Sequence, residues 1–374
     1  MNQTADVVVV GGGVIGCFIA YELSKAGFEV VVVEKSQVGS EASSAAAGLL
    51  VPLHVAEQER TPLFDLYMAS TKMFPKFVTE LQHETVIDVE YRPSGILRVS
   101  LSDEEEAVRF STFQTWQNAF GMAMTWLDKK EVHELEPELT PTVCGSIFSH
   151  DEGYINSARL VLALARGASL GKTRVLQGCP ARGIQRKGKR FSAIQTNEGE
   201  VSAGHLVIAA GAWSRGLCEE LGFTIPIAPV RGQMLAVTTL QRTVQRPINS
   251  SRGGVIPRAD GTVYVGATVE HVGFDKRNTP EAIAGLLEKG SALVPRLSEG
   301  RIERMWSGLR PFCEDGLPVI GALPGWENVA VATGHYTMGI TASPMTAKII
   351  KDLIADEHWD RSIDIFSPAR FVSR

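Results

Sequence analysis

The chain has 374 residues, a formal charge of −5 and 21% charged residues, which is an ordinary globular composition and enough length for two domains. It has no basic stripe and no apolar run of about 18 residues, so neither nucleic-acid binding nor a membrane span is expected. Five scattered cysteines without a CxxC pair, and eight histidines without ligand spacing, predict a reduced cytoplasmic protein with no metal site.

The N-terminal segment predicts a strand, a helix and a second strand. Residues 5–10 are a β-branched run typical of a buried parallel strand, residues 14–27 have apolar positions at helical spacing, and residues 28–35 form another buried run. A β-α-β unit of this kind is the building block of a doubly wound nucleotide-binding sheet.

The sequence GGGVIG lies between this first strand and the helix. Gly11 permits a tight turn, Gly13 lets the backbone approach a pyrophosphate, and Gly16 lets the helix pack closely on the strand. The helix N-terminus offers free N–H groups to phosphate. Glu34 ends the second strand at the offset of a ribose-binding acid, which disfavours NADP. This motif alone leaves NAD and FAD open.

Further along the chain, residues 62–82 predict a helix with an apolar face, residues 95–101 a half-buried strand, and Ser102 the N-cap of the next helix. Asp260-Gly261 predicts a hairpin turn. Residues 205–214 and 328–333 predict buried strands that end in glycine turns, the second opening a long helix. The expected core positions of the helix at residues 62–82 are Leu63, Leu66, Met73, Phe77 and Leu81.

Nucleotide-binding signals therefore occur at the start, middle and end of the chain, with antiparallel-looking strands between them. The predicted fold is α/β (α+β), with a discontinuous Rossmann-like domain and an inserted, mostly antiparallel β substrate domain. The first domain is assigned residues 1–85, 144–222 and 306–374, and the second 86–143 and 223–305.

Six other segments complete an ordered set of motifs: SSAAAGLL, GAWS, PVRGQML, VYVGATVEHVGFD, GLRPFCEDGLPVIG and ATGHYTMGIT. With the N-terminal motif they resemble, over nearly the whole chain, the FAD-dependent glycine oxidase and D-amino acid oxidase family, in particular the bacterial glycine oxidases of thiamine biosynthesis. The resemblance implies FAD as the cofactor. It also implies non-covalent attachment, because Cys313 does not fall where the attachment cysteine of related sarcosine oxidases aligns.

The resemblance places the small residues from Ala46 to Leu49 along the flavin ring, where bare backbone N–H groups can reach the ring edge. It places the segment from His335 to Thr341 at a helix N-terminus that stabilises negative charge on the reduced ring. An alternative for His335 is a satisfied turn histidine whose backbone matters more than its ring. The complete implied set of FAD contacts is Gly11, Gly13, Val14, Ile15, Gly16, Glu34, Lys35, Ala42, Ser43, Ser44, Ala46, Ala47, Gly48, Leu49, Ala181, Gly211, Trp213, Gly334, His335, Tyr336, Thr337, Met338, Gly339, Ile340 and Thr341.

By the same resemblance, Arg310 in WSGLRP binds the substrate carboxylate and is the residue assigned to catalysis. The alternative is an arginine in a surface salt bridge. Gly254 and Thr337 stand where glycine oxidases carry a tyrosine and a second arginine, so the pocket is expected to be wider.

The remaining substrate positions are Val51 and His54 on an entrance loop, Val269 where methionine is frequent, and Arg252. Arg252 is either a substitute charge or a solvated arginine at a strand end. The substrate is left open among glycine, sarcosine, a bulkier D-amino acid and a cyclic imino acid.

The implied reaction is oxidative deamination by hydride transfer from the substrate Cα to flavin N5. Dioxygen then accepts the electrons, which gives hydrogen peroxide, ammonia or an amine, and a 2-oxo acid. Two alternatives are a dehydrogenase that passes electrons to a quinone or partner subunit, and a catalytically silent flavoprotein subunit. A homo-oligomer is also left open.

Overall fold

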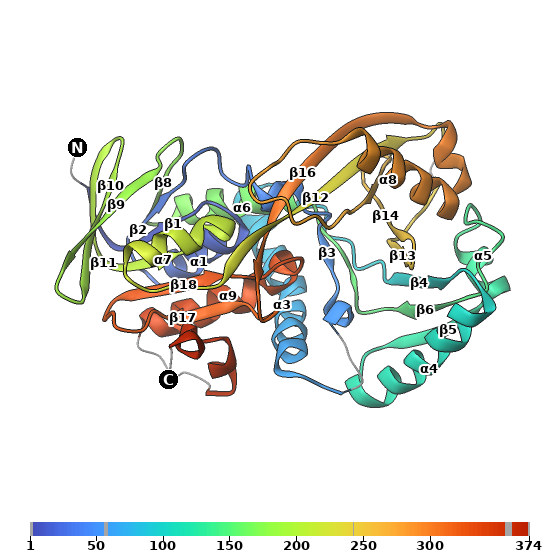
Figure 1. Ribbon diagram of the computed structural model, residues 1–374, viewed down its shortest axis with the longest axis horizontal. Coiled ribbons are helices and arrows are strands. Elements are labelled where there is room, and N and C mark those ends of the chain that lie inside the picture. Colours follow the sequence, from blue (N-terminus) through green and yellow to red (C-terminus); the bar gives the residue numbers. More distant parts are fainter. Residues whose placement is uncertain (1–2, 56–58, 242, 356–360, 373–374) are drawn as a thin grey trace.

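The computed structural model describes residues 3–55, 59–241, 243–355 and 361–372, and most of its strands form two eight-stranded sheets (Figure 1). The first sheet has the order β17-β18-β11-β1-β2-β8, and the β9–β10 hairpin extends it through a β10–β11 pair. Its strands are β1 (Gln3–Val10), β2 (Val30–Val33), β8 (Thr173–Leu176), β9 (Ala181–Lys187), β10 (Arg190–Thr196), β11 (Gly199–Ile208), β17 (Val319–Ala322) and β18 (Val329–Thr333).

The centre of the first sheet is parallel, as the valine-rich runs predict. β1 pairs in parallel with both β2 and β11, and β18 continues this arrangement next to β11. Alternate valines of β1 and β2 enter two separate cores, one on each face of the sheet, which explains why every residue of β2 is buried.

Helices fill the core on one face of the first sheet. They are α1 (Val14–Lys25), α3 (Pro62–Thr85), α6 (Ser157–Leu170) and α9 (Gly339–Ile354). The predicted helix at residues 62–82 is confirmed and extends to Thr85. Of its expected core positions, Leu66, Phe77 and Leu81 are buried, whereas Leu63 and Met73 are half-buried and pack nearer the edge.

The second sheet has the order β16-β12-β15-β14-β13-β4-β6-β5 and lies on the other side of the molecule (Figure 1). Every neighbouring pair in it is antiparallel except β13 and β4. Its strands are β4 (Ile96–Ser100), β5 (Met124–Asp128), β6 (Gly145–Ser149), β12 (Ile227–Thr238), β13 (Ile248–Ser250), β14 (Gly253–Pro257), β15 (Thr262–Gly266) and β16 (Arg301–Cys313).

The predicted antiparallel sheet is thus confirmed, and so is the hairpin turn at Asp260-Gly261 between β14 and β15. The strand predicted at residues 95–101 is confirmed as β4, but the prediction that it is half-buried is wrong. All five residues of β4 are buried, because Ile96 packs into the core of the first domain while Leu97 and Val99 pack into the core of the second sheet.

The sheets divide the chain differently from the predicted segments at two places. β6 follows residue 144 but belongs to the second sheet, and β16 crosses residue 306 as one continuous strand. The predicted domain boundaries remain a prediction that should be adjusted at these strands.

Smaller elements connect the two sheets. β3 (Leu49–Leu50) pairs with β7 (Gly153–Tyr154) between the sheets (Figure 1). Ser102 caps α4 (Asp103–Phe120) through its side chain, as predicted. The other elements are α2 (Ala42–Ala45), α5 (Lys129–Leu135), α7 (Ser214–Glu220), α8 (Pro280–Leu293), and the 3-10 helices η1 (Pro52–Val55), η2 (Gly211–Trp213), η3 (Pro295–Glu299), η4 (Arg361–Phe366) and η5 (Pro368–Phe371). Among the helices described, none combines the length and the apolar character needed to cross a bilayer.

Candidate active site

One cavity of about 770 Å³ runs from the GGGVIG turn to the second sheet. Its walls come from the first sheet, from the segment between Glu41 and Val51, from β12–β16, and from the turn before α9. A cofactor bound against the first sheet would therefore face a substrate bound against the second.

The dinucleotide end of this cavity is built from bare backbone. A Cβ at Gly11 would lie 2.4 Å from the carbonyl oxygen of Ala209, and Gly11 has a φ of +116°, so a side chain cannot be accommodated there. The carboxylate of Glu34 accepts hydrogen bonds from the N–H groups of Gly12 at 2.7 Å and Ser36 at 2.8 Å. This arrangement holds the acid at the end of β2, where a ribose hydroxyl would reach it.

Hydrogen bonds to four consecutive carbonyl groups fix the orientation of the segment from Ala45 to Leu49. The oxygens of Ala45, Ala46, Ala47 and Gly48 accept hydrogen bonds from Trp306, Ser157, Arg258 and Ile155 respectively. Because a trans peptide sets N–H opposite C=O, the next N–H group in each case points away from these partners. The segment lines the cavity, so these N–H groups are available to a flavin ring edge.

The turn before α9 continues the wall formed by the segment from Ala46 to Leu49, and five consecutive residues from Tyr336 to Ile340 line the cavity. The positive end of the α9 dipole is at this wall. His335 also lines the cavity but is 2% exposed, and its Nε2 lies 3.0 Å from Oγ1 of Thr346. The ring is therefore a satisfied, buried histidine, in agreement with the alternative considered for it.

Burial lowers the pKa of His335 from 6.5 to about 3, which predicts an acid-sensitive fold. The unfolded chain binds a proton here below about pH 6.5 and the folded chain does not. The free energy of unfolding should therefore fall as pH drops, by up to about 1.4 kcal/mol per unit from this residue. Denaturant titrations at pH 7.5 and 5.0 test this: His335→Gln should show a smaller loss than the parent protein. An equal loss in both would contradict the assignment.

Arg310 projects from β16 into the cavity, over a position where β12 has no side chain. A Cβ at Gly232 would lie 2.2 Å from Nη2 of Arg310, so this glycine makes room for the guanidinium. Nη1 of Arg310 donates a hydrogen bond of 3.0 Å to the neutral carbonyl of Thr268. The Arg310 side chain is half-buried, and this loss of solvation lowers its pKa.

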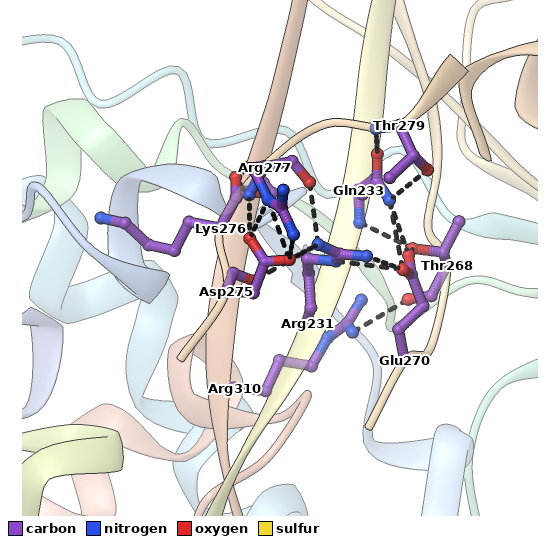
Figure 2. A network of polar contacts seen from close by, with 10 residues as sticks. Arg231, Gln233, Thr268, Glu270, Asp275, Lys276, Arg277, Thr279 and Arg310 are labelled. Atoms are coloured by element: carbon purple, nitrogen blue, oxygen red, sulfur yellow. Dashed lines mark hydrogen bonds and ion pairs between the residues drawn. The ribbon is translucent and has the colours of Figure 1, made fainter. Parts of the chain in front are cut away.

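A polar network holds the loop that carries Thr268 (Figure 2). Its members are Arg231, Gln233, Thr268, Glu270, Asp275, Arg277 and Thr279. Arg231 of β12 is 4% exposed and donates to Glu270 through Nε at 3.0 Å, while Gln233 donates to the same carboxylate at 2.9 Å. Burial raises the pKa of Glu270, but hydrogen bonds from Thr268, Arg231 and Gln233 outweigh it and leave the pKa below its usual range.

Within the polar network the charge of Arg231 is paired with carboxylates, so Arg310 remains available to bind another anion. Glu270 is engaged by Arg231 and Gln233, and Asp275 lies 3.2 Å from Arg231 and 2.9 Å from Arg277. Arg310 is joined to the network only through the Thr268 carbonyl in Figure 2. The cavity therefore presents a positioned cation suited to a carboxylate.

Removing the charge of Glu270 should disturb Arg310 at a distance. In Glu270→Gln, Arg231 loses a carboxylate partner and the loop loses its anchor, so we expect the KM for substrate to rise roughly 10-fold or more with FAD still bound. Arg277→Gln is the matched control, because it breaks an exposed pair on the same loop and should change KM less than about twofold. Steady-state kinetics would contradict the positioning role if both variants behaved alike.

Most of the predicted site residues meet in this one cavity. The lining includes, among the predicted cofactor positions, Gly11, Gly13, Val14, Ile15, Glu34, Lys35, Ala42, Ser43, Ala46, Ala47, Gly48, Leu49, Ala181, Gly211, Trp213, His335, Tyr336, Thr337, Met338, Gly339 and Ile340, and among the predicted substrate positions Arg310, Val51, His54, Gly254, Val269 and Thr337.

Five predicted residues lie outside the lining. Gly16 is packed beneath the turn, where a Cβ would lie 1.9 Å from the oxygen of Gly11, and Ser44 turns toward Gly39. Gly334 lies behind the wall with a φ of +76°, and Thr341 supports Leu49 with a 3.1 Å hydrogen bond to its carbonyl. Arg252 lies at the β13–β14 turn and is not part of the lining of this cavity.

Cysteine is absent from the cavity lining, and all five cysteines belong to the part of the chain that the structure describes. Cys313 is fully buried, and its pKa is raised to about 12 by burial. A thiol in that state is a poor nucleophile. This supports the prediction of non-covalent FAD.

Sequence reasoning missed two parts of the site. The polar network joins β12 to the loop after β15, and the pairing of β12 with β16, which sets Arg231 opposite Leu309 and Val230 opposite Arg310, brings the network to the strand that carries Arg310. Arg98 lines the cavity from β4, but the expected half-buried strand gave it no role. A charged residue inside an otherwise apolar strand was the available signal.

A parallel nucleotide-binding sheet, an antiparallel second sheet and one cavity between them define a two-domain, dinucleotide-dependent oxidoreductase. The chain belongs to the FAD dependent oxidoreductase (DAO) family, whose model matches residues 6–353. FAD is accordingly its cofactor, and the bare backbone around Gly11 and Gly48 fits it.

Two sequence relatives cover the whole chain. It is 31% identical to the glycine oxidase of Geobacillus kaustophilus, over 100% of this chain and 99% of that protein. It is 32% identical to the bifunctional protein ThiO/ThiG of Synechocystis sp., of which it spans 55% of the length.

Solved structures agree with this assignment. The glycine oxidase from Geobacillus kaustophilus superposes with a TM-score of 0.94 at 30% identity, covering 99% of this chain and 100% of that one. The glycine oxidase from Bacillus cereus gives 0.90 at 31% identity, covering 96% and 97%. The α/β fold, the recognition of the family and the FAD cofactor predicted from the sequence are confirmed.

Proposed function

We propose that the protein oxidatively deaminates an amino acid and uses dioxygen as the electron acceptor. The observation that carries the proposal is Arg310, a half-buried cation in the cavity whose hydrogen bond goes to a neutral carbonyl while Glu270 is engaged by Arg231. Relatives named glycine oxidase support the substrate class.

The geometry gives the residues of this chain roles in binding and orienting the substrate and in stabilising charge. Arg310 binds the substrate carboxylate and fixes the Cα relative to the wall formed by residues 46–49 and 336–340. FAD, when bound, supplies the redox chemistry by taking a hydride from the substrate Cα and passing the electrons on. The N–H groups of the 46–49 segment and the α9 N-terminus stabilise negative charge at that wall.

His54 has no role as a proton donor in this scheme. Partial loss of solvation at the cavity wall lowers the pKa of His54, and the Arg98 guanidinium lowers it further, so the protonated form of the ring is disfavoured. A substrate amine that loses its proton to solvent needs no positioned base. The cavity lining therefore agrees with a reaction whose rate depends mainly on how the substrate is oriented.

Measuring turnover in air tests whether dioxygen is the electron acceptor. The purified holoprotein, given an amino acid that reduces its flavin, should consume one dioxygen and release one hydrogen peroxide per substrate oxidised. Turnover with an artificial dye but without oxygen consumption would instead assign a dehydrogenase. Flavin that no amino acid reduces would support a catalytically silent subunit.

A further inference from the structure

A row of four residues crosses the second sheet on the side of the cavity away from the α9 turn. Gly266 of β15 pairs with Gly254 of β14, Gly254 pairs with Asn249 of β13, and Asn249 pairs with Arg98 of β4. Residues paired across neighbouring strands share one face of a sheet. All four line the cavity, and we call them the distal row.

Of the two glycines in the distal row, Gly254 leaves open space, whereas Gly266 makes room for a neighbouring side chain, because a Cβ there would lie 2.7 Å from Cγ of Met234. A Cβ at Gly254 would have its nearest contact at 3.3 Å, with the carbonyl oxygen of Ile248, and Gly254 does not have a positive φ. A side chain could therefore occupy this position with a small adjustment of its neighbour. The missing side chain at Gly254 extends the cavity along the sheet from Met234, which covers Gly266, to Asn249.

Arg98 ends the distal row as a fixed, buried cation. It is 7% exposed, and both of its Nη atoms bind the carboxylate of Glu152, with Nη2 at 2.9 Å from Oε1. Glu152 is 1% exposed and lies behind the cavity wall, where it also accepts the N–H of Leu53 at 3.1 Å. This ion pair thus fixes both the guanidinium and the turn that carries His54.

The ion pair uses two of the five N–H donors of Arg98, so the guanidinium keeps donors that can serve the cavity it lines. The adjacent Asn249 amide adds a polar group at the same end. The carboxylates in the described lining, Glu34 and Glu41, are not at this end: Glu34 binds the N–H of Gly12 in the dinucleotide turn, and Glu41 pairs with Lys35 next to it. The charge of Arg98 is paired with Glu152, but its remaining N–H donors call for a hydrogen-bond acceptor, and a carboxylate offers two acceptor oxygens, one for Arg98 and one for the Asn249 amide.

We propose that the substrate is an extended amino acid whose side chain or N-substituent ends in a carboxylate. Arg310 holds the α-carboxylate, the chain passes over Met234 and Gly254, and Arg98 with Asn249 binds the distal carboxylate. This inference rests on the proposed function and names its substrate class.

A matched series of substrates tests the distal row. D-glutamate and D-2-aminoadipate carry the terminal carboxylate, and D-norvaline and D-norleucine are apolar compounds of comparable length. The ratio of kcat/KM for each acid over its apolar partner should be at least 10 in the parent protein. A second readout is the Kd of glutarate against that of butyrate, measured by their perturbation of the flavin spectrum without turnover.

The test variant is the double substitution Arg98→Met with Glu152→Met. Removing both partners avoids leaving a lone buried charge, so the protein should fold. The kcat/KM ratio should fall to about 1, and the preference for glutarate should be lost with it. Arg296→Met with Glu138→Met removes an exposed pair of the same type in the second domain and should leave the ratio unchanged.

Gly254→Leu gives an independent check, because a side chain there fills the distal row. The ratio of kcat/KM for D-2-aminoadipate over D-alanine should fall at least 10-fold. The inference is overturned if short amino acids reduce the flavin but the acids are not preferred, or if their preference survives the double substitution. If no amino acid of either length reduces the flavin, the proposed function itself has failed.

Discussion

Replacement of Arg310 by methionine should lower kcat/KM for amino acids by roughly 10²–10³-fold while the protein keeps its flavin. The expected loss follows from removing one partner of a desolvated, charge-assisted contact, which costs about 2–5 kcal/mol. Methionine has a similar length and is neutral, so the void left over Gly232 stays small. The measurement is steady-state kinetics together with the ratio of flavin to protein absorbance.

Two further variants define what this result means. Arg310→Lys keeps the charge but loses the planar fork, so it should recover part of the activity and raise KM. Arg301→Met removes an exposed arginine from the same strand and should leave kinetics unchanged. Arg310→Met with normal turnover and normal flavin content would show that another group holds the substrate.

Gly48→Ala should abolish flavin binding or the fold itself. A Cβ at this position would lie 1.9 Å from the backbone oxygen of Ile155, and Gly48 has a φ of +77°. Relief requires β3 and β7 to separate, which displaces the segment whose N–H groups face the cavity. The FAD content of the purified variant and its thermal unfolding midpoint measure the effect.

Gly285→Ala provides the control for this substitution. Gly285 lies in α8 with open space around its Cβ position, so alanine should be neutral or should stabilise the helix by up to about 1 kcal/mol. If Gly48→Ala retained FAD and stability as Gly285→Ala does, the tight approach of β3 to Ile155 would not be required.

The fold could be predicted from the sequence wherever a single local pattern of residues specifies a single helix, strand or turn. The valine run of β1, the glycines after it and the apolar face of α3 each encode a local structure. The second sheet was harder, because its strands are neighbours in space without being neighbours in sequence. β6 and β16 crossed the predicted boundaries for this reason.

The same distinction between local and long-range patterns applies to the residues of the candidate site. The residues that line the cofactor end come from short contiguous motifs, such as the segment from Ala46 to Leu49, and the sequence indicated them. Arg98 and Glu270 act through partners 54 and 39 residues away, and a single sequence does not display such pairings. Arg252 was expected near the substrate because it precedes Gly254, but the β13–β14 turn places it beyond the cavity.

The most direct test of the central claim is anaerobic titration of the purified flavoprotein with amino acids while its visible spectrum is recorded. The panel should include glycine, sarcosine, D-alanine, D-proline and D-glutamate. The account predicts that at least one bleaches the oxidised flavin band, that D-glutamate does so more efficiently than D-alanine, and that Arg310→Met requires far higher concentrations. A fully loaded flavin that none of these compounds reduces would contradict amino acid oxidation by this protein.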